Sequence, residues 1–221
     1  MMKLCLGNVF ILGDSYSTFC GYIPKEHDSY YSAEGRPETD VNRVEQTWWY
    51  RVIKVTNSHL VLNHSWSVTP ICNTGYAGPN VPNSFIRRFD RLVADCFFVN
   101  NHIDTVFVMG GPNDYASDAP IGELKIQDWT EEDLLNYGPA VCYLMHRLKL
   151  VLPNARIIFI INAEMRSEIM DYQEKAAKFF NVEYIRLADG AVEKRNAHPT
   201  ILGMKQISEQ VLLYLQDYAQ R

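Results

Sequence analysis

Short apolar runs alternate with longer amphipathic stretches along this chain, and the short runs predict β-strands. They are rich in β-branched residues and are bounded by Gly, Asn or Asp, as the strands of a buried sheet are. They cover residues 9–12, 59–62, 105–109, 156–161 and 182–187. The runs at 105–109 and 156–161 are almost uninterrupted, which is typical of central strands that are buried on both faces.

In the longer stretches, apolar residues recur at intervals of three and four, which predicts amphipathic helices between the strands. The predicted buried faces carry Val44, Trp48 and Val52; Phe85, Phe89, Leu92 and Cys96, after a Ser84 cap; Val141, Leu144, Met145 and Leu148; and Met204, Ile207, Val211 and Leu215. Residues 130–133 (Thr-Glu-Glu-Asp) are typical of the first turn of a helix, and Gly138-Pro139 predicts a kink or a new start within it.

Five strands that alternate with helices predict an α/β fold with a mostly parallel sheet covered on both faces. The simplest topology is a flavodoxin-like three-layer α/β/α sandwich with strand order 2-1-3-4-5. The 221 residues, of which 47% are hydrophobic, suffice for one core, so we expect a single domain over residues 1–221. Residues 20–40 and 111–128 fall outside this plan and are expected to be loops that shape a substrate site.

Charge and cysteine content narrow the class of protein. The formal net charge of -5 gives no basic surface for nucleic acid, and no apolar run approaches the roughly 20 residues of a membrane span. The five cysteines are odd in number and form no Cys-x-x-Cys pair, which favours free thiols in a reducing compartment. Residues 4–12 are apolar but continue into Gly13 without a small-residue cleavage site, so we interpret them as a strand rather than a signal peptide. We therefore expect a cytoplasmic protein without nucleic-acid or membrane partners.

Polar residues that suit catalysis follow the predicted strands. In open α/β sheets, ligands bind beyond the carboxyl ends of the strands. The first strand is followed by Gly13-Asp14-Ser15, the third by residues 110–114 (Gly-Gly-Pro-Asn-Asp), and the fifth by a stretch that reaches His198. A serine, a side-chain amide and a histidine are thus expected at one edge of the sheet. Because a serine nucleophile needs a base and a developing oxyanion needs donors, this set favours acyl transfer.

The order and spacing of these segments resemble the SGNH (GDSL-type) hydrolase family. Gly13-Asp14-Ser15, Gly111-x-Asn113-Asp114 and His198-Pro199 are similar to three of the family's four sequence blocks. The resemblance implies that Ser15 is the nucleophile and that His198 is the general base. It also implies that the Ser15 backbone N–H and the Asn113 side chain stabilise the oxyanion. The implied activity is hydrolysis of small acyl esters, acetyl above all, on small molecules such as carbohydrates, without a cofactor.

Two positions depart from the family pattern. Val68 stands where the second block has a glycine whose backbone N–H serves the oxyanion, and a β-branched residue resists positive φ. Arg195 stands where the family has its acid, three residues before the histidine, and a cation cannot stabilise an imidazolium. The Val68 N–H is still a candidate donor. Either Asp189 or Glu193 supplies the acid, or the site is a Ser–His dyad helped by a backbone carbonyl.

Two alternatives come from other functional classes. A catalytically weakened relative would bind a carbohydrate without hydrolysing it, which both departures favour. In a flavodoxin-like FMN binder, the hydroxyl groups of Ser15, Ser17 and Thr18 would form a phosphate loop. The FMN hypothesis leaves Asn113 and His198 without a role.

Further candidate residues lie in or beside the long loops. Tyr22, Tyr115 and Trp129 are placed to stack on a sugar ring. The six histidines show no paired ligand spacing, so no metal is expected.

Overall fold

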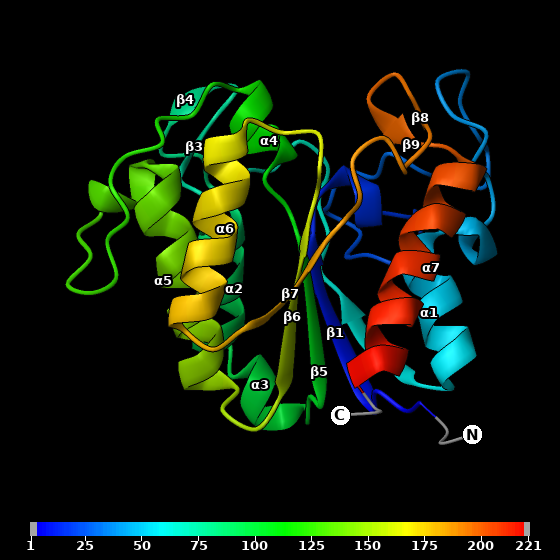
Figure 1. Cartoon of the computed structure of the whole chain (residues 1–221), viewed down its shortest axis with the longest axis horizontal. Helices are drawn as coiled ribbons and strands as arrows, with labels where there is room; N and C mark the ends of the chain where they lie inside the picture. Colours follow the sequence, from blue (N-terminus) through cyan, green and yellow to red (C-terminus); the bar gives the residue numbers. More distant parts are fainter. Residues whose placement is uncertain (1–3, 219–221) are drawn as a thin grey trace.

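A five-stranded parallel sheet runs through the centre of the computed structural model, which describes residues 4–218 (Figure 1). Its strands are β1 (Asn8–Gly13), β2 (His59–Asn63), β5 (Thr105–Met109), β6 (Arg156–Ile161) and β7 (Glu183–Arg186). They lie in the order β2-β1-β5-β6-β7, and every neighbouring pair is parallel. The five predicted strands and the predicted order 2-1-3-4-5 are therefore confirmed.

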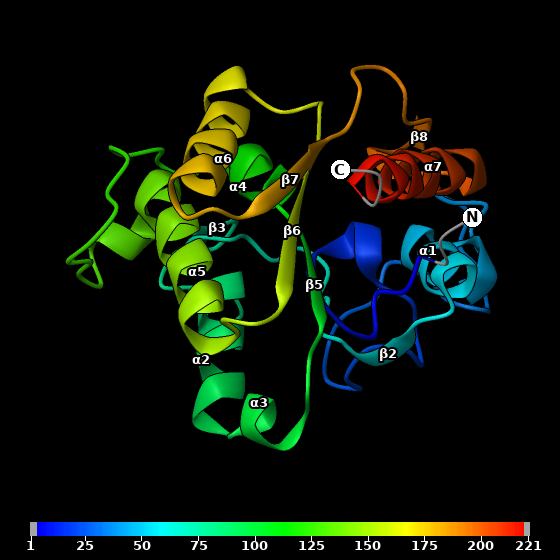
Figure 2. The ribbon, with the colours of Figure 1, turned by 60° about the horizontal axis from the view of Figure 1, so that its bottom comes forward.

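Helices cover both faces of this sheet, as Figures 1 and 2 show. One face carries α1 (Trp48–Thr56) and α7 (Ile201–Tyr218); the other carries α2 (Phe85–Ala94), α3 (Phe97–Asn100), α5 (Tyr137–Val151) and α6 (Ser167–Phe179). Because successive side chains of a strand point to opposite faces, β1 contributes to two cores. Val9 and Ile11 pack with α1 and α7, whereas Phe10 and Leu12 pack with α2 and α5. The predicted three-layer sandwich is confirmed.

Some helix boundaries differ from the predicted ones. Val44 lies in a separate 3-10 turn, η2 (Val44–Gln46), because an extended residue stands between it and α1. Cys96 lies outside α2, with φ of 57°, ahead of α3. The prediction of a helix start at 130–133 is wrong, because this stretch leads only into the short η3 (Asp133–Leu135). α5 starts afresh at Tyr137 and holds Pro139 in its first turn, where proline is tolerated.

The two long stretches differ in structure. Residues 111–128 begin with α4 (Pro112–Ala116), whereas residues 20–40 contain only a bridge between Arg36 and Thr39. Two short hairpins complete the fold: β3 (Thr74–Gly75) with β4 (Gly78–Pro79), and β8 (Lys194–Arg195) with β9 (His198–Pro199). Both hairpins lie at the edge of the sheet where the parallel strands end (Figure 1). Within residues 4–218, no helix is long and apolar enough to cross a membrane.

Candidate active site

A serine hydroxyl and a histidine ring meet at the carboxyl end of β1. Ser15 begins the 3-10 turn η1 (Ser15–Ser17), which Asp14 caps by accepting a hydrogen bond from the Tyr16 N–H at 3.0 Å. Its Oγ lies 2.9 Å from Nε2 of His198. Gly13 is required before this turn, because a Cβ there would lie 2.6 Å from the Ser65 Oγ. The turn therefore presents Ser15 to His198 at a place where the chain is packed too closely for a side chain at position 13.

The histidine stands on the tight hairpin formed by β8 and β9, called here the His198 hairpin (residues 194–199). Its two turn residues, Asn196 and Ala197, have φ of 48° and 61°, as a two-residue turn with both centres left-handed requires. The Nδ1 of His198 lies 2.9 Å from the Asn196 carbonyl oxygen. With Nδ1–H donating to that carbonyl, Nε2 has a free lone pair for the Ser15 proton.

Neither candidate acid contacts this histidine. The Glu193 carboxylate accepts a hydrogen bond from the Thr200 Oγ1 at 2.6 Å, and Asp189 is exposed on the stretch after β7. Within residues 4–218, His198 has no carboxylate partner. Arg195, at the family's acid position, lies opposite His198 in the hairpin register and is exposed. The backbone carbonyl of Asn196 thus stands where a triad would have its acid.

Three tyrosines, which the sequence analysis did not select, hold the His198 hairpin. The ring of Tyr30 is stacked on the His198 ring, with centroids 3.5 Å apart and planes at 7°. The Tyr16 hydroxyl donates to the Ala197 carbonyl oxygen at 2.5 Å, and the Tyr31 hydroxyl donates to the Pro199 carbonyl oxygen at 3.0 Å. The tyrosine content of residues 20–40 was the available signal, but an irregular loop has no periodicity to show which ring points inward.

The candidate oxyanion donor is fixed from several sides. Asn113 lies in the first turn of α4, directly after Gly111 and Pro112. Its Nδ2 donates to the Thr69 carbonyl oxygen at 3.1 Å, which leaves its second N–H for another acceptor. Gly111 has φ of 114°, and a Cβ there would lie 2.9 Å from the Gln173 Nε2. The neighbouring Asp114 is buried and accepts the backbone N–H groups of residues 71 and 72.

Val68 adopts the left-handed backbone that its residue type disfavours. Its φ is 63°, and its side chain is 59% exposed. A glycine takes this conformation without strain, whereas a β-branched residue in it is an outlier. Val68 thus occupies a backbone conformation that suits glycine better than valine.

A fully buried arginine holds this segment in place. Arg88 of α2 donates to the Gly13 carbonyl oxygen and to the Thr69 Oγ1, both at 3.1 Å, and also to the His64 carbonyl oxygen. Burial lowers the pKa of Arg88 to about 9, while the charge of Asp14 acts in the opposite direction. Burial likewise raises the pKa of Asp14 to about 7. Arg88 thus connects the end of β1 with the loop that carries Val68.

The titration of the histidine suits a base. Burial lowers the pKa of His198 from its ordinary value of 6.5, and the nearby cations of Arg36 and Lys194 act in the same direction. The Asn196 carbonyl acts against them. The neutral imidazole is thus the predominant form near pH 7, which is the form that accepts a proton.

A pocket of about 210 Å³ opens beside these groups. It is lined by three of the candidate residues, Ser15, Asn113 and His198. The rest of its wall consists of Tyr16, Tyr76, Pro112, Tyr115, Ala116, Asn162, Glu164, Lys194 and Ala197. Two of the lining residues form an ion pair, since the Lys194 Nζ lies 2.8 Å from a carboxylate oxygen of Glu164. Of the three aromatic candidates for substrate stacking, Tyr115 lines the pocket.

The other two aromatic candidates lie elsewhere. Trp129 packs against Tyr143 and His146 of α5, and its indole N–H donates to the Lys125 carbonyl oxygen at 2.8 Å. The end of the loop thus turns back onto the helix layer instead of reaching the site. Tyr22 packs against the rings of Phe19 and Trp49 and is not part of the pocket wall.

The FMN hypothesis does not fit the turn after β1. Ser17 and Thr18 are buried. The Ser17 Oγ accepts the Trp48 indole N–H at 3.1 Å, and the Thr18 Oγ1 donates to the Ser15 carbonyl oxygen at 2.9 Å. These hydroxyl groups are engaged inside the protein, so they present no open cradle for a phosphate.

Within residues 4–218, no cluster of three or more His, Cys, Asp or Glu side chains could hold a metal ion.

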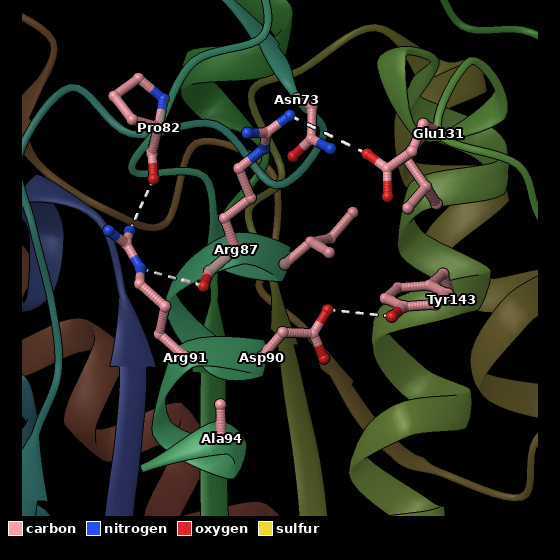
Figure 3. Close-up of a pocket in the computed structure, with 10 residues that line it drawn as sticks. Asn73, Pro82, Arg87, Asp90, Arg91, Ala94, Glu131 and Tyr143 are labelled. Carbon is pink, nitrogen blue, oxygen red and sulfur yellow. Dashed lines mark hydrogen bonds and ion pairs between the residues drawn. The ribbon is translucent and has the colours of Figure 1, made fainter.

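A larger cavity of about 480 Å³ lies between α2 and α5 (Figure 3). Its polar groups bond within the cavity wall: the Tyr143 hydroxyl donates to Asp90 at 2.9 Å, an Arg87 nitrogen lies 3.9 Å from Glu131, and Arg91 donates to the Pro82 carbonyl oxygen at 2.6 Å. It contains neither a serine nor a histidine. The smaller pocket is therefore the one that brings Ser15, Asn113 and His198 together.

Known proteins resemble this chain in sequence and in fold. The family model described as GDSL-like Lipase/Acylhydrolase matches residues 7–215. A protein from Bacteroides ovatus ATCC 8483 described as a GDSL-like lipase is 37% identical, with a TM-score of 0.88 and coverage of 96% of this chain and 99% of that chain. A second, from Bacteroides uniformis ATCC 8492, is 38% identical, with a TM-score of 0.86 and 96% coverage of both chains.

A more distant likeness concerns the fold alone. A family two carbohydrate esterase from Clostridium thermocellum, solved in complex with cellohexaose, is 14% identical, with a TM-score of 0.66 and coverage of 96% of this chain and 64% of that chain. No curated protein matches the sequence.

Proposed function

The chain belongs to the GDSL-like lipase/acylhydrolase family, whose members hydrolyse esters, and from this premise we propose that it is a single-domain serine esterase with Ser15 as nucleophile and His198 as general base. The observation that carries the proposal is the distance of 2.9 Å between the Ser15 Oγ and the His198 Nε2. A serine hydroxyl is a weak nucleophile until a base within hydrogen-bond reach accepts its proton.

The proposed reaction has two steps. The Ser15 oxygen attacks the ester carbonyl carbon while its proton passes to the His198 Nε2. The intermediate then collapses, the bond to the alcohol breaks, and the departing alcohol takes the proton from His198. A water molecule attacks the acylated Ser15 and gives a proton to His198, which returns it to the Ser15 oxygen as the acid leaves.

The proposed oxyanion donors are the Ser15 backbone N–H, the second N–H of the Asn113 amide and the Val68 backbone N–H. Such donors stabilise the charge that develops on the carbonyl oxygen and act most strongly when they are fixed in advance. The bond from Asn113 to the Thr69 carbonyl oxygen supports this role, since it fixes the amide plane.

The base works in this proposal without a carboxylate. The Asn196 carbonyl holds Nδ1–H, which selects the tautomer with a free Nε2. Asp189 and Glu193 are not assigned a catalytic role.

We further propose that the substrate is a small acyl ester, acetyl above all, of a polar alcohol such as a carbohydrate. The pocket of about 210 Å³ is smaller than the roughly 300–1,000 Å³ of drug-sized ligand sites, which supports a short acyl group. Asn162, Glu164 and Lys194 offer hydrogen bonds to hydroxyl groups, and Tyr115 offers an apolar face. All five cysteines are free, which supports action in a reducing compartment such as the cytoplasm.

The test is hydrolysis of p-nitrophenyl esters of increasing acyl length by wild type, Ser15→Ala and His198→Ala. Each variant should lose about 10⁵–10⁶ in kcat, as removal of a nucleophile or its base does. Ser17→Ala removes a hydroxyl from the same turn and serves as the matched control, with turnover per folded molecule retained. A folded Ser15→Ala protein with wild-type turnover would end the proposal. An inactive wild type that still binds a sugar would instead support the weakened relative that the Arg195 and Val68 departures favour.

A further inference from the structure

The His198 ring has a partner on its face as well as at its edge. Its Nδ1 faces only a neutral carbonyl, that of Asn196. The Tyr30 ring is stacked on one face, with centroids 3.5 Å apart and planes at 7°, whereas the Tyr16 ring is inclined at 62° with its centroid 5.6 Å away. A stack this close and this parallel fixes the plane of the imidazole as well as its position.

We propose that Tyr30 is a positioning residue. Through its ring face it performs the role that a triad acid would have, since this chain lacks that acid. The proposal rests on the serine esterase function proposed above. A triad acid holds the imidazole in its orientation and stabilises the imidazolium that forms when the serine gives up its proton. The Asn196 carbonyl selects the tautomer, and the negatively polarised face of Tyr30 holds the ring plane and attracts the cation.

Tyr30 is tied to the nucleophile through its backbone. Its N–H donates to the Thr18 Oγ1 at 2.9 Å, and that same hydroxyl donates to the Ser15 carbonyl oxygen at 2.9 Å. One threonine therefore connects the turn that presents the nucleophile with the residue that covers the base. Tyr30 is thereby connected to both Ser15 and His198, which helps to keep these two side chains aligned.

Arg36 completes the stack. Its guanidinium carbon lies 4.8 Å from the centroid of the Tyr30 ring, and its Nη1 donates to the Tyr30 carbonyl oxygen at 3.3 Å. Because His198 covers one face, the guanidinium lies over the other. Tyr30 is thus held between a permanent cation and the ring that becomes a cation during each catalytic cycle.

Few groups around His198 favour its protonated form, so the contact with the face of the Tyr30 ring is important for the imidazolium. Arg36 and Lys194 carry positive charge and disfavour the cation. The Tyr16 and Tyr31 rings are steeply inclined to the histidine ring, with centroids 5.6 and 6.5 Å away, so neither is stacked on it as the Tyr30 ring is. In the described part of the chain, the favourable contacts are the Asn196 carbonyl, the Ser15 oxygen and the Tyr30 face.

The test compares Tyr30→Leu, which keeps an apolar cover but removes the π face, with Tyr30→Phe, which keeps the face. Tyr30→Leu should lower kcat about 3- to 30-fold, the range of a cation–π contact, with KM changed less than about twofold because Tyr30 does not line the pocket. Tyr30→Phe should stay within about threefold of wild type. The acidic limb of kcat/KM against pH should move down by about half a pH unit in Tyr30→Leu only.

A second measurement does not depend on turnover. The His198 imidazole is titrated by NMR in Ser15→Ala, with and without Tyr30→Leu or Tyr30→Phe. We expect the pKa to fall by about half a unit with Tyr30→Leu and to stay unchanged with Tyr30→Phe. A merely structural Tyr30 would give the opposite sign, because a loosened hairpin admits water to the ring and raises the pKa. If Tyr30→Leu does not fold, Tyr30→Met, an adaptable non-aromatic side chain, replaces it.

Three outcomes overturn the proposal: an unchanged or raised His198 pKa in the variant without a π face, a wild-type kcat in that variant, or a higher KM at constant kcat, which would mark a substrate contact instead. A failure of the serine esterase function is separate, because it would show as an inactive wild type or as a Ser15→Ala variant that keeps its activity, whatever happens at position 30.

Discussion

The two sides of the candidate site are built in different ways. The oxyanion side comprises Ser15, Asn113 and residues 64–69, and it is held by buried polar groups such as Asp114 and Arg88. The base side comprises the His198 hairpin and the tyrosines around it, and its turn residues are exposed. One side is an extension of the core, whereas the other is a surface hairpin held by three tyrosines, one through its ring face and two through their hydroxyl groups.

This difference predicts different responses to substitution. Buried, hydrogen-bonded groups have no alternative partners, so a change on the oxyanion side leaves an unsatisfied group and costs both stability and rate. Ring contacts on the base side are graded, since a substituted ring loses only part of its contact. We therefore expect steep losses on the first side and smaller ones around the base.

The largest effect that tests this contrast is expected at Asn113. Asn113→Ala should lower kcat by roughly 10²–10³ with little change in KM, because one oxyanion donor is lost. Asn113→Asp keeps the shape but carries no N–H and should lose as much. Both are measured on preparations with known thermal stability. If Asn113 only shapes the turn, Asn113→Ala would unfold at a lower temperature yet keep its activity per folded molecule.

A smaller effect is expected from removing acids on the base side. Asp189→Asn and Glu193→Gln should each stay within about tenfold of wild-type kcat, as bystander substitutions do. The reason is that neither carboxylate contacts His198, and Glu193 is bonded to Thr200 instead. Steady-state kinetics of both variants against wild type make the measurement. A loss of several orders of magnitude in either one would mean that an acid is recruited during turnover, and the two sides would then be alike.

The smallest effect concerns backbone strain on the oxyanion side. Val68→Gly should raise the free energy of unfolding by about 1 kcal/mol, because relief of a strained left-handed residue outweighs the extra flexibility of glycine. The melting temperature should rise by about 2–4 °C. Val55→Gly is the matched control: Val55 is also exposed but lies in α1, so that variant should be less stable. Equal destabilisation by both changes would show that the left-handed backbone at Val68 carries no strain.

The oxyanion side was also the more predictable one from sequence. The pattern of strands predicted the order of the sheet. Parallel strands bring their carboxyl ends together, so this order also predicted that the polar residues after β1 and β5 lie at the same edge of the sheet. The predicted proximity of Ser15 and His198 agrees with their contact of 2.9 Å in the structure. These inferences work because regular elements impose regular spacing on the chain.

The rest of the site depends on contacts that have no local pattern. The sequence analysis did not predict α6, because the polar Gln173 interrupts the apolar pattern of its buried face. The Gln173 amide donates instead to the Gly110 carbonyl oxygen at 2.9 Å. Tyr30 lies in an irregular loop, and Trp129 lies at the end of another that folds back on α5. Residue type alone does not tell which of two loop aromatics reaches a site 100 residues or more away in sequence.

The hydrogen bond between Ser15 and His198, the proposed nucleophile and base, joins residues that are 183 positions apart. During synthesis at about 5–20 residues per second, Ser15 is therefore made roughly 10–40 seconds before its base. Throughout that interval the serine is an ordinary, unreactive alcohol. In the proposed mechanism, activity begins only once the His198 hairpin is in place, so the rate at which a newly made chain gains esterase activity would report the completion of folding.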